Sequence, residues 1–352
     1  MRGLGYWLLR RLVMVPLIVV LTTLFAALTV GSLLVGVLAW PVLVARGRRA
    51  RWRPIRVTAL ALAYLVADCL IMVISLLLWV ASGFGWRLRA PWVVRAHLAL
   101  LTVFLGGLVA LARPLFGFRL VVDEPRRHPE DLLRAEESGP LLVLARHAGP
   151  GASFALVHLL IARYHRHPLV VLKEQLRLDP AVDLLLTRIG CAWVPTTRGK
   201  EDAAERVGRA AAALGPRQAL VLFPEGADWT PLRHLKAVAR LRRRGLVRQA
   251  QQALRMPHVL PPRPAGALAA LQGAPDADVL VFTHTGHDEL LDAAAAWRAL
   301  PLSHPLHMMW WREPAGQVPR DDAEAVGVWL QQTWSGIDAW VSEQIDLAAL
   351  RP

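Results

Sequence analysis

The sequence predicts an α/β protein in which membrane helices are followed by a mixed, largely parallel sheet covered by helices. Three observations predict this class. Long apolar runs fill the first third of the 352-residue chain. After residue 116, short apolar runs alternate with longer helical stretches, a pattern typical of parallel sheets. Turns that carry histidine, arginine and glutamate follow several of the predicted strands.

The first apolar run, residues 12–45, contains no charged residue. A straight helix of that length would measure about 50 Å, whereas the hydrocarbon core of a bilayer is about 30 Å thick. The run is therefore expected to span the membrane with a steep tilt, or to break near Gly31-Ser32 and turn back. The arginines at its start favour the hairpin, because they would prefer the cytoplasmic side. The run is too long for a cleavable signal peptide.

Two further apolar runs follow. Residues 57–86 hold a single charge, Asp68, and residues 96–112 are just long enough to span a membrane or to lie in its interface. Residues 1–116 are therefore predicted to form an N-terminal membrane region with two to four hydrophobic segments. Asp68 is interpreted as a buried carboxylate paired with a neighbouring helix, with a functional role as the alternative.

Charge points to the partners and to the location of the chain. Lysine and arginine number 41 against 27 aspartates and glutamates, a net charge of +14 that suits nucleic acid, anionic lipid or a phosphorylated substrate. Six arginines lie between the first two apolar runs, and the positive-inside rule predicts that this loop and the domain after residue 116 are cytoplasmic. Cys69 and Cys191 are too few for a disulfide framework. We expect an integral membrane protein.

Residues 117–352 are predicted to form one α/β domain. The expected strands are the short apolar runs 140–145, 168–172, 191–194, 218–223, 278–283 and 306–311. The expected helices are residues 153–165, 180–189, 203–214, 232–247 and 321–350. Tryptophans in the last helix are expected to pack onto the sheet. Neither GxGxxG nor a Walker A sequence is present, so a nucleotide-binding fold lacks its fingerprint.

Four short blocks carry the chemistry. His147 follows the first strand of the domain and precedes a Gly/Pro turn, which is a good place for an exposed general base. Arg198 follows another strand and could hold a phosphate. The block Phe223-Pro224-Glu225-Gly226 presents a carboxylate after a third strand, and the fourth block is Met256 to Pro264. Each block read alone is better explained by an ordinary structural turn or loop than by a catalytic role.

Taken together, these blocks resemble the PlsC-type glycerolipid acyltransferases, over roughly residues 117–345. Phe-Pro-Glu-Gly is the family's third motif, and His147 aligns with the histidine of its first motif, His-x4-Asp. Arg198 matches the arginine of the second motif, and Lys173 lies in a stretch that matches the family's upstream segment loosely. The segments around Asp228 and Arg263 look closer to the branch that acylates lysocardiolipin and lysophosphatidylinositol.

The resemblance implies transfer of a fatty acyl group from acyl-CoA or acyl carrier protein to a lysophospholipid hydroxyl, in phospholipid synthesis or remodelling. His147 and Glu225 are the expected catalytic residues. The expected substrate-binding residues are Arg198, Lys173, Gly226, Asp228 and Arg263. No metal or other cofactor is expected, and the partners are membrane lipids, the lysophospholipid acceptor and the acyl donor rather than nucleic acid.

One departure from the family pattern matters. The first motif requires an acid five positions after the histidine, where this chain has Ala152. The sequence therefore leaves open a weak or inactive enzyme, an engineered loss, or a different carboxylate that substitutes. The main alternative function is a catalytically inactive lipid-binding protein on the same fold. A metallohydrolase that uses the pairs His284/His287 and His304/His307, and a membrane protein that binds RNA, are further alternatives.

Overall fold

The computed structural model describes residues 9–45, 52–123, 139–149, 151–195 and 200–350. The chain divides into two compact units. The first comprises Met1–Arg119, Lys173–Cys191 and Ala296–Ser303, and the second comprises Leu120–Leu172, Ala192–Ala295 and His304–Pro352. The domain boundary expected at residue 116 stays a prediction, since the first unit also takes in two segments from later in the chain.

The first unit contains three helices that are long and apolar enough to cross a membrane. They are α2 (Met14–Ala45), α3 (Arg53–Ala81) and α4 (Pro91–Phe116), and a short π-helical turn, η1 (Leu9–Val13), precedes α2. Helix α2 continues through Gly31-Ser32, so the predicted hairpin is wrong. A glycine inside a helix costs only about 1 kcal/mol, which a long apolar run tolerates without breaking.

Asp68 is buried in α3, close to Asp179. Asp179 follows the short helix η2 (Glu174–Leu178) and caps α6 (Pro180–Ile189), because its side chain accepts a hydrogen bond from the backbone N–H of Val182 at 2.9 Å. Tyr64, one turn before Asp68, donates its hydroxyl hydrogen to the Asp179 carboxylate. The bond between Tyr64 and Asp179 joins α3 to α6 within the first unit. Both carboxylate oxygens of Asp68 are buried without a hydrogen-bond partner among the described residues, so its pairing with a neighbouring helix stays a prediction.

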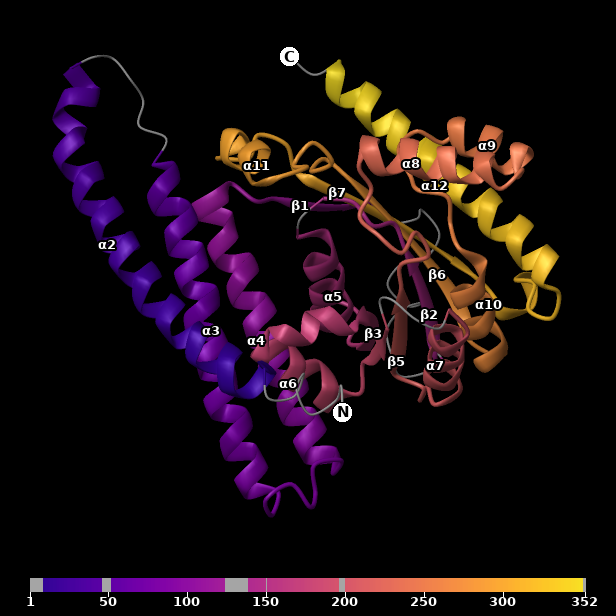
Figure 1. Ribbon diagram of the computed structural model, residues 1–352, viewed down its shortest axis with the longest axis horizontal. Coiled ribbons are helices and arrows are strands. Elements are labelled where there is room, and N and C mark those ends of the chain that lie inside the picture. Colours follow the sequence, from indigo (N-terminus) through magenta and orange to yellow (C-terminus); the bar gives the residue numbers. More distant parts are fainter. Residues whose placement is uncertain (1–8, 46–51, 124–138, 150, 196–199, 351–352) are drawn as a thin grey trace. The chain divides into compact units, whose positions relative to one another are not determined.

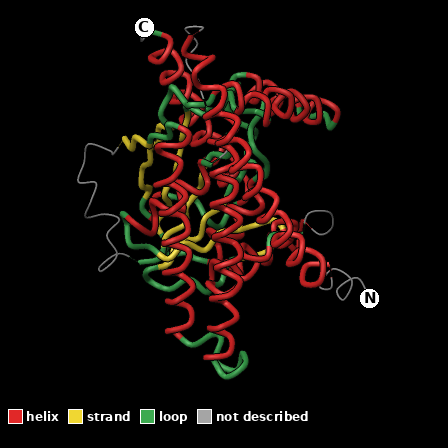
Figure 2. The backbone as a smooth tube through the Cα atoms, turned by 90° about the vertical axis from the view of Figure 1, so that its left-hand side faces the viewer, coloured by secondary structure: helices red, strands yellow, loops and turns green. Residues whose placement is uncertain are grey.

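The second unit is built on a seven-stranded sheet with the order β1-β7-β6-β2-β5-β3-β4. The strands gather in one sheet, drawn in yellow in Figure 2. Their bounds are β1 Leu120–Asp123, β2 Leu141–Ala145, β3 His167–Lys173, β4 Ala192–Val194, β5 Gln218–Leu222, β6 Asp278–Thr285 and β7 Leu306–Glu313. Strand β2 pairs in parallel with β5 and β6, whereas β7 is antiparallel to β6. The predicted mixed, largely parallel sheet is confirmed.

Helices cover both faces of this sheet. Helices α7 (Lys200–Ala212), α10 (Pro264–Gly273) and α12 (Ala323–Ala349) lie on one side (Figure 1), and their buried side chains join those of β2, β5 and β6 in one core. Helix α5 (Ala152–Ala162) lies on the other side. All five residues of β2 are buried, as expected for a central strand covered on both faces. The remaining helices are α8 (Pro231–Arg243), α9 (Val247–Leu254), α11 (Ala293–Ala299) and the short η3 (Ala315–Gln317).

The structure corrects the prediction for one helix and shows elements that the sequence analysis did not predict, among them α11. The single helix expected over residues 232–247 is two helices, α8 and α9, because Gly245 adopts a positive φ of 72° between them. Strand β1 and helix α10 were not expected. The tryptophans of α12 pack onto the core as predicted, and Trp334 is fully buried.

The apolar helices predict firm membrane attachment. Most of the side chains in the apolar windows of α2, α3 and α4 are not buried inside the protein, so they need a hydrocarbon environment. We expect the full chain to stay in the membrane pellet after an alkaline carbonate wash and to leave it only with detergent. Recovery in the wash supernatant, beside a peripheral marker protein, would contradict membrane insertion.

Candidate active site

The parallel strands β2, β5 and β6 bring three loops to one edge of the sheet. Val143 of β2 is level with Val221 of β5 and with Leu280 of β6. The carboxyl ends of the three strands therefore lie side by side, which is where open α/β sheets bind their ligands. His147 follows β2 and Glu225 follows β5, so the sequence placed both residues at the correct edge.

Glu225 joins three segments of the second unit. One carboxylate oxygen, Oε1, accepts hydrogen bonds from the backbone N–H of His147 at 3.1 Å and from the indole N–H of Trp334 at 3.4 Å. The other oxygen, Oε2, accepts from the backbone N–H of Leu260 at 2.9 Å. The residue is only 1% exposed. These hydrogen bonds connect the loops around Glu225, and its expected catalytic role stays a prediction.

Burial controls the charge of Glu225. Removal from water raises its pKa from 4.5 to about 7, because the charged form is poorly solvated there. The positive charge of Arg146 and the three N–H donors oppose this rise. The Glu225 carboxylate therefore takes up a proton near neutral pH.

Arg146 is a buried cation of this region, and apart from its place before His147 nothing in the sequence indicates its role. Its guanidinium donates two hydrogen bonds to the backbone carbonyl of His258, at 3.1 and 2.7 Å, and one to the backbone carbonyl of His284. It also forms an ion pair with Asp288 at 2.7 Å. Burial raises the pKa of Asp288, but the charge of Arg146, together with His284 and the hydrogen bonds from Thr285 and Arg146, lowers that pKa overall. Arg146 thus ties the end of β2 to the loops that follow α9 and β6.

The ring of His147 lies between Phe223 and Asp228. Its centroid is 4.5 Å from that of the Phe223 ring, with 35° between the planes. Its Nδ1 atom lies 3.0 Å from Oδ1 of Asp228. From the sequence, Asp228 was expected to bind the substrate. In the structure its carboxylate contacts the imidazole of His147. A histidine with a carboxylate at one ring nitrogen can accept a proton at the other.

Gly226 and Arg263 meet at the turn after β5. Gly226 has a positive φ of 70°, and a Cβ at this position would lie 3.1 Å from Nη1 of Arg263. The backbone N–H of Arg263 donates to the carbonyl of Pro224 at 2.9 Å. The guanidinium of Arg263 is partly shielded from water although the residue is exposed; this shielding, together with the nearby charge of Arg240, lowers the pKa of Arg263. The glycine therefore lets a guanidinium approach the turn that carries Glu225.

Two other predicted binding residues cannot be added to this site. Lys173 ends β3, is exposed and belongs to the first compact unit. Arg198 lies outside the described residues. Of the residues expected at the site, the structure therefore brings together His147, Glu225 and Asp228, with Gly226 and Arg263 at the adjoining turn.

Helix α12 contributes two residues that sequence reasoning missed as parts of the site. Trp334 reaches Glu225, and the carboxylate of Asp338, one turn later, accepts the backbone N–H of His258 at 2.7 Å. Burial raises the pKa of Asp338. An aspartate four residues after a tryptophan on the apolar face of a helix was the available signal, because buried carboxylates need partners.

Two histidines of the pairs, His284 and His287, contact backbone carbonyls of neighbouring loops. Nε2 of His284 lies 3.1 Å from the backbone carbonyl of Arg146, and this contact assigns the ring hydrogen to Nε2. Burial and the adjacent Arg146 lower the pKa of His284 to about 3, so this ring is neutral at physiological pH. Nε2 of His287 lies 3.4 Å from the carbonyl of His304. Among the described residues, no group of three His, Cys, Asp or Glu side chains could hold a metal ion.

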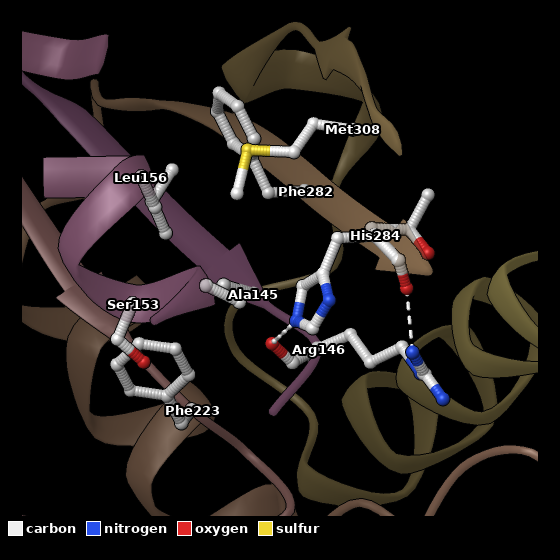
Figure 3. A pocket seen from close by; sticks show the side chains of 10 residues that line it. Ala145, Arg146, Ser153, Leu156, Phe223, Phe282, His284 and Met308 are labelled. Carbon is white, nitrogen blue, oxygen red and sulfur yellow. Dashed lines mark hydrogen bonds between the residues drawn. The ribbon is translucent and has the colours of Figure 1, made fainter. Parts of the chain in front are cut away.

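A small cavity lies beside the His147 loop (Figure 3). Its lining side chains come from the ends of β2, β5, β6 and β7 and from the start of α5: Ala145, Arg146, Ala152, Ser153, Leu156, Phe223, Phe282, Thr283, His284 and Met308. Most of them are apolar. The buried hydroxyl of Thr283 has no hydrogen-bond partner among the described residues. Ala152, the residue that departs from the first motif, therefore faces unfilled space.

Comparison with known proteins agrees with this fold. Residues 124–263 match a family model described as Acyltransferase. The crystal structure of the 1-acyl-sn-glycerophosphate (LPA) acyltransferase PlsC from Thermotoga maritima matches 83% of this chain and 97% of its own, with a TM-score of 0.51 and 13% sequence identity. The fold is PlsC-like. No curated protein matches the chain significantly. The match between residues 124–263 and the Acyltransferase family supports acyl transfer as the general activity of this PlsC-like fold.

Glu225→Gln is expected to show a stability cost that depends on pH. The pKa of Glu225 is higher in the folded than in the unfolded chain, so between about 4.5 and about 7 the folded state binds more protons. Wild type therefore loses stability through this group as the pH rises across that window, whereas glutamine does not titrate. The substitution removes one hydrogen-bond acceptor and so lowers the free energy of unfolding. This loss should be smaller at pH 8 than at pH 4.5 by up to about 3 kcal/mol.

Unfolding of both proteins in detergent at several pH values measures this difference. The matched control is Glu205→Gln, which removes an exposed carboxylate on α7. A cost that stays constant across the pH range would show that Glu225 is ionised throughout.

Proposed function

We propose that the protein transfers a fatty acyl group from an acyl thioester, acyl-CoA or acyl carrier protein, to the hydroxyl of a lysophospholipid. The observation that carries this proposal is the contact between the two motif loops: the backbone N–H of His147 donates to Glu225, and the His147 ring faces the same turn. The Acyltransferase match over residues 124–263 and the PlsC-like fold support it. The reaction would serve phospholipid synthesis or remodelling.

His147 is the proposed general base. With its Nδ1 atom against a carboxylate, the ring presents Nε2 for the proton of the acceptor hydroxyl. The hydroxyl oxygen bonds to the thioester carbonyl carbon as this proton moves to Nε2. The carbon–sulfur bond then breaks, and the imidazolium returns its proton to the departing thiolate. The products are the acylated phospholipid and a free thiol, and no acyl group is attached to the protein.

Glu225 and Arg263 have supporting roles in this proposal. Glu225 is a positioning residue, because its carboxylate is buried and holds the backbone of His147. Arg263 is exposed at the turn and is proposed to bind the phosphate of the acceptor. Lys173 and Arg198 remain proposed phosphate ligands on the resemblance alone. The proposal that the acceptor is lysocardiolipin or lysophosphatidylinositol is likewise supported by the resemblance alone.

The proposed location is the membrane, with the acyltransferase domain on the cytoplasmic face. The apolar helices α2, α3 and α4 support the membrane part. The arginine-rich loop between the first two apolar runs supports the orientation. Neither a metal nor an organic cofactor has a part in the proposed steps, and nucleic acid is not a proposed partner.

His147→Gln is expected to lower kcat/KM by about 10³-fold, because general-base catalysis contributes about 10²–10⁴. The measurement is transfer of a labelled acyl group to lysophospholipids by the purified full chain in lipid nanodiscs. His165→Asn is the matched control: His165 is exposed and has a positive φ of 51°, which asparagine tolerates. If wild type and His147→Gln are equally inactive with every acceptor, the inactive lipid-binding alternative, which Ala152 favours, replaces this proposal.

Arg263→Gln is expected to raise KM for the phosphate-bearing acceptor about tenfold or more while kcat changes less, because a charge-assisted hydrogen bond contributes about 1.5–3 kcal/mol. Steady-state kinetics with the acceptor varied separates the two constants. Arg209→Gln, on the exposed face of α7, is the control for loss of one positive charge. An unchanged KM would remove Arg263 from the acceptor site.

A further inference from the structure

We propose that Asp228 is the carboxylate that positions His147, in place of the acid that the first motif would supply at Ala152. The alanine cannot hold an imidazole, yet Oδ1 of Asp228 lies 3.0 Å from Nδ1 of His147. The carboxylate comes from the loop after β5 instead of from the start of α5. This inference rests on the proposed function, because an orienting carboxylate matters only if His147 acts as a base.

The backbone fixes Asp228 in this place. The N–H of Trp229, the next residue, donates to the carbonyl of His147 at 2.6 Å, and Ala148 and Trp229 form a parallel β-bridge. In the other direction, the N–H of His147 donates to Glu225. The loop that carries Asp228 is therefore bonded to the His147 backbone on both sides of the carboxylate. The contact between the ring and Asp228 follows from this short extension of the sheet.

The contact determines which ring nitrogen can act. A carboxylate only accepts hydrogen bonds, so Nδ1 carries the hydrogen and Nε2 is left with its lone pair. The negative charge also stabilises the imidazolium formed when Nε2 takes a proton. Packing against Phe223 limits rotation of the ring. The contact with Asp228 thus sets the tautomer of His147, helps to fix the orientation of its ring and places a negative charge beside it.

Several other charged or titratable groups lie near this pair. Arg146 precedes His147 in the chain, and the Glu225 carboxylate accepts the backbone N–H of His147. Arg233, at the start of α8, donates to the backbone carbonyl of Asp228 at 3.0 Å and lies 3.8 Å from Oδ2. His284 is close enough to His147 to interact electrostatically, and it is neutral. Because the Asp228 side chain is 49% exposed, water screens its charge. Its effect should therefore be smaller than that of a buried triad carboxylate.

The surroundings of Ala152 agree with a relocated carboxylate. Ala152 is buried in the first turn of α5 and lines the apolar cavity of Figure 3. The cavity gives room for a larger side chain, and Thr283 offers a hydroxyl that has no partner among the described residues. An aspartate can therefore be introduced at residue 152 to ask whether the missing acid limits the enzyme.

The test is Asp228→Asn in the full chain in nanodiscs, which keeps the shape of the side chain and removes its charge. We expect kcat to fall by about 10²-fold, less than the roughly 10⁴ seen for a buried triad. The acidic limb of the pH–rate profile should also move to lower pH, because a carboxylate no longer favours the imidazolium. A purely structural defect would lower the rate without moving that limb.

Three further variants sharpen the result. Arg233→Gln separates the ion pair with α8 from the contact with His147 and should leave the pH profile in place. Glu205→Gln, an exposed carboxylate outside the site, should leave the rate unchanged. Ala152→Asp should raise the rate by no more than about threefold, since the imidazole already has a carboxylate.

The outcomes distinguish this inference from the proposed function. If His147→Gln abolishes turnover while Asp228→Asn stays within about threefold of wild type, the inference is wrong and the function stands. A gain of about tenfold or more in Ala152→Asp would also overturn it, since the acid would then have been missing. If wild type itself turns over no thioester with any lysophospholipid, the proposed function fails first.

Discussion

A single buried carboxylate holds together the loops on which the proposed chemistry depends. Glu225 accepts hydrogen bonds from the backbone of His147, from the backbone of Leu260 and from the indole of Trp334. These donors follow β2, follow α9 and lie on α12, so three distant parts of the sequence meet at one side chain. An unpaired buried N–H costs about 1–3 kcal/mol, so each contact resists displacement of its loop. The hydrogen bonds of Glu225 thus hold the protein backbone around the imidazole in place.

Arg146 and the N–H donors partly offset the cost of burying this carboxylate. Arg146 is as deeply buried as Glu225 and carries the opposite charge, and its own donors are satisfied by backbone carbonyls and Asp288. A buried charge without such partners would be costly. The region under His147 is consequently a connected polar network, whereas the cavity beside it is mostly apolar. The ring itself lies at the rim, where a substrate hydroxyl and a carboxylate could both reach it.

The sequence predicted the sheet better than it predicted the site. Apolar runs predicted six strands, because central parallel strands are buried on both faces and therefore consist of continuous apolar stretches. The short edge strand β1, Leu120–Asp123, gave no such run. The end of the predicted helix 232–247 was wrong because one glycine with positive φ splits it. The hairpin in the first apolar run was wrong because charge preference at the ends says little about a break in the middle.

Only part of the site could be predicted from the sequence, and the reason is physical. Motif spacing identifies which loops carry His147 and Glu225, and parallel pairing brings those loops to one edge. Spacing cannot show that Glu225 faces inward, or that Asp228 approaches the imidazole, because both depend on hydrogen bonds between loops distant in sequence. Arg146, Trp334 and Asp338 were missed for the same reason.

The most direct measurement of the central claim is a single turnover. Purified full-length protein in nanodiscs would be mixed with a stoichiometric amount of an acyl thioester labelled in its acyl group, and with lysophospholipids of each headgroup class. We expect the label to pass to the phospholipid product at the rate at which free thiol appears, with none bound covalently to the protein. Label that accumulates on the protein, or thioester that is not consumed with any acceptor, would contradict it.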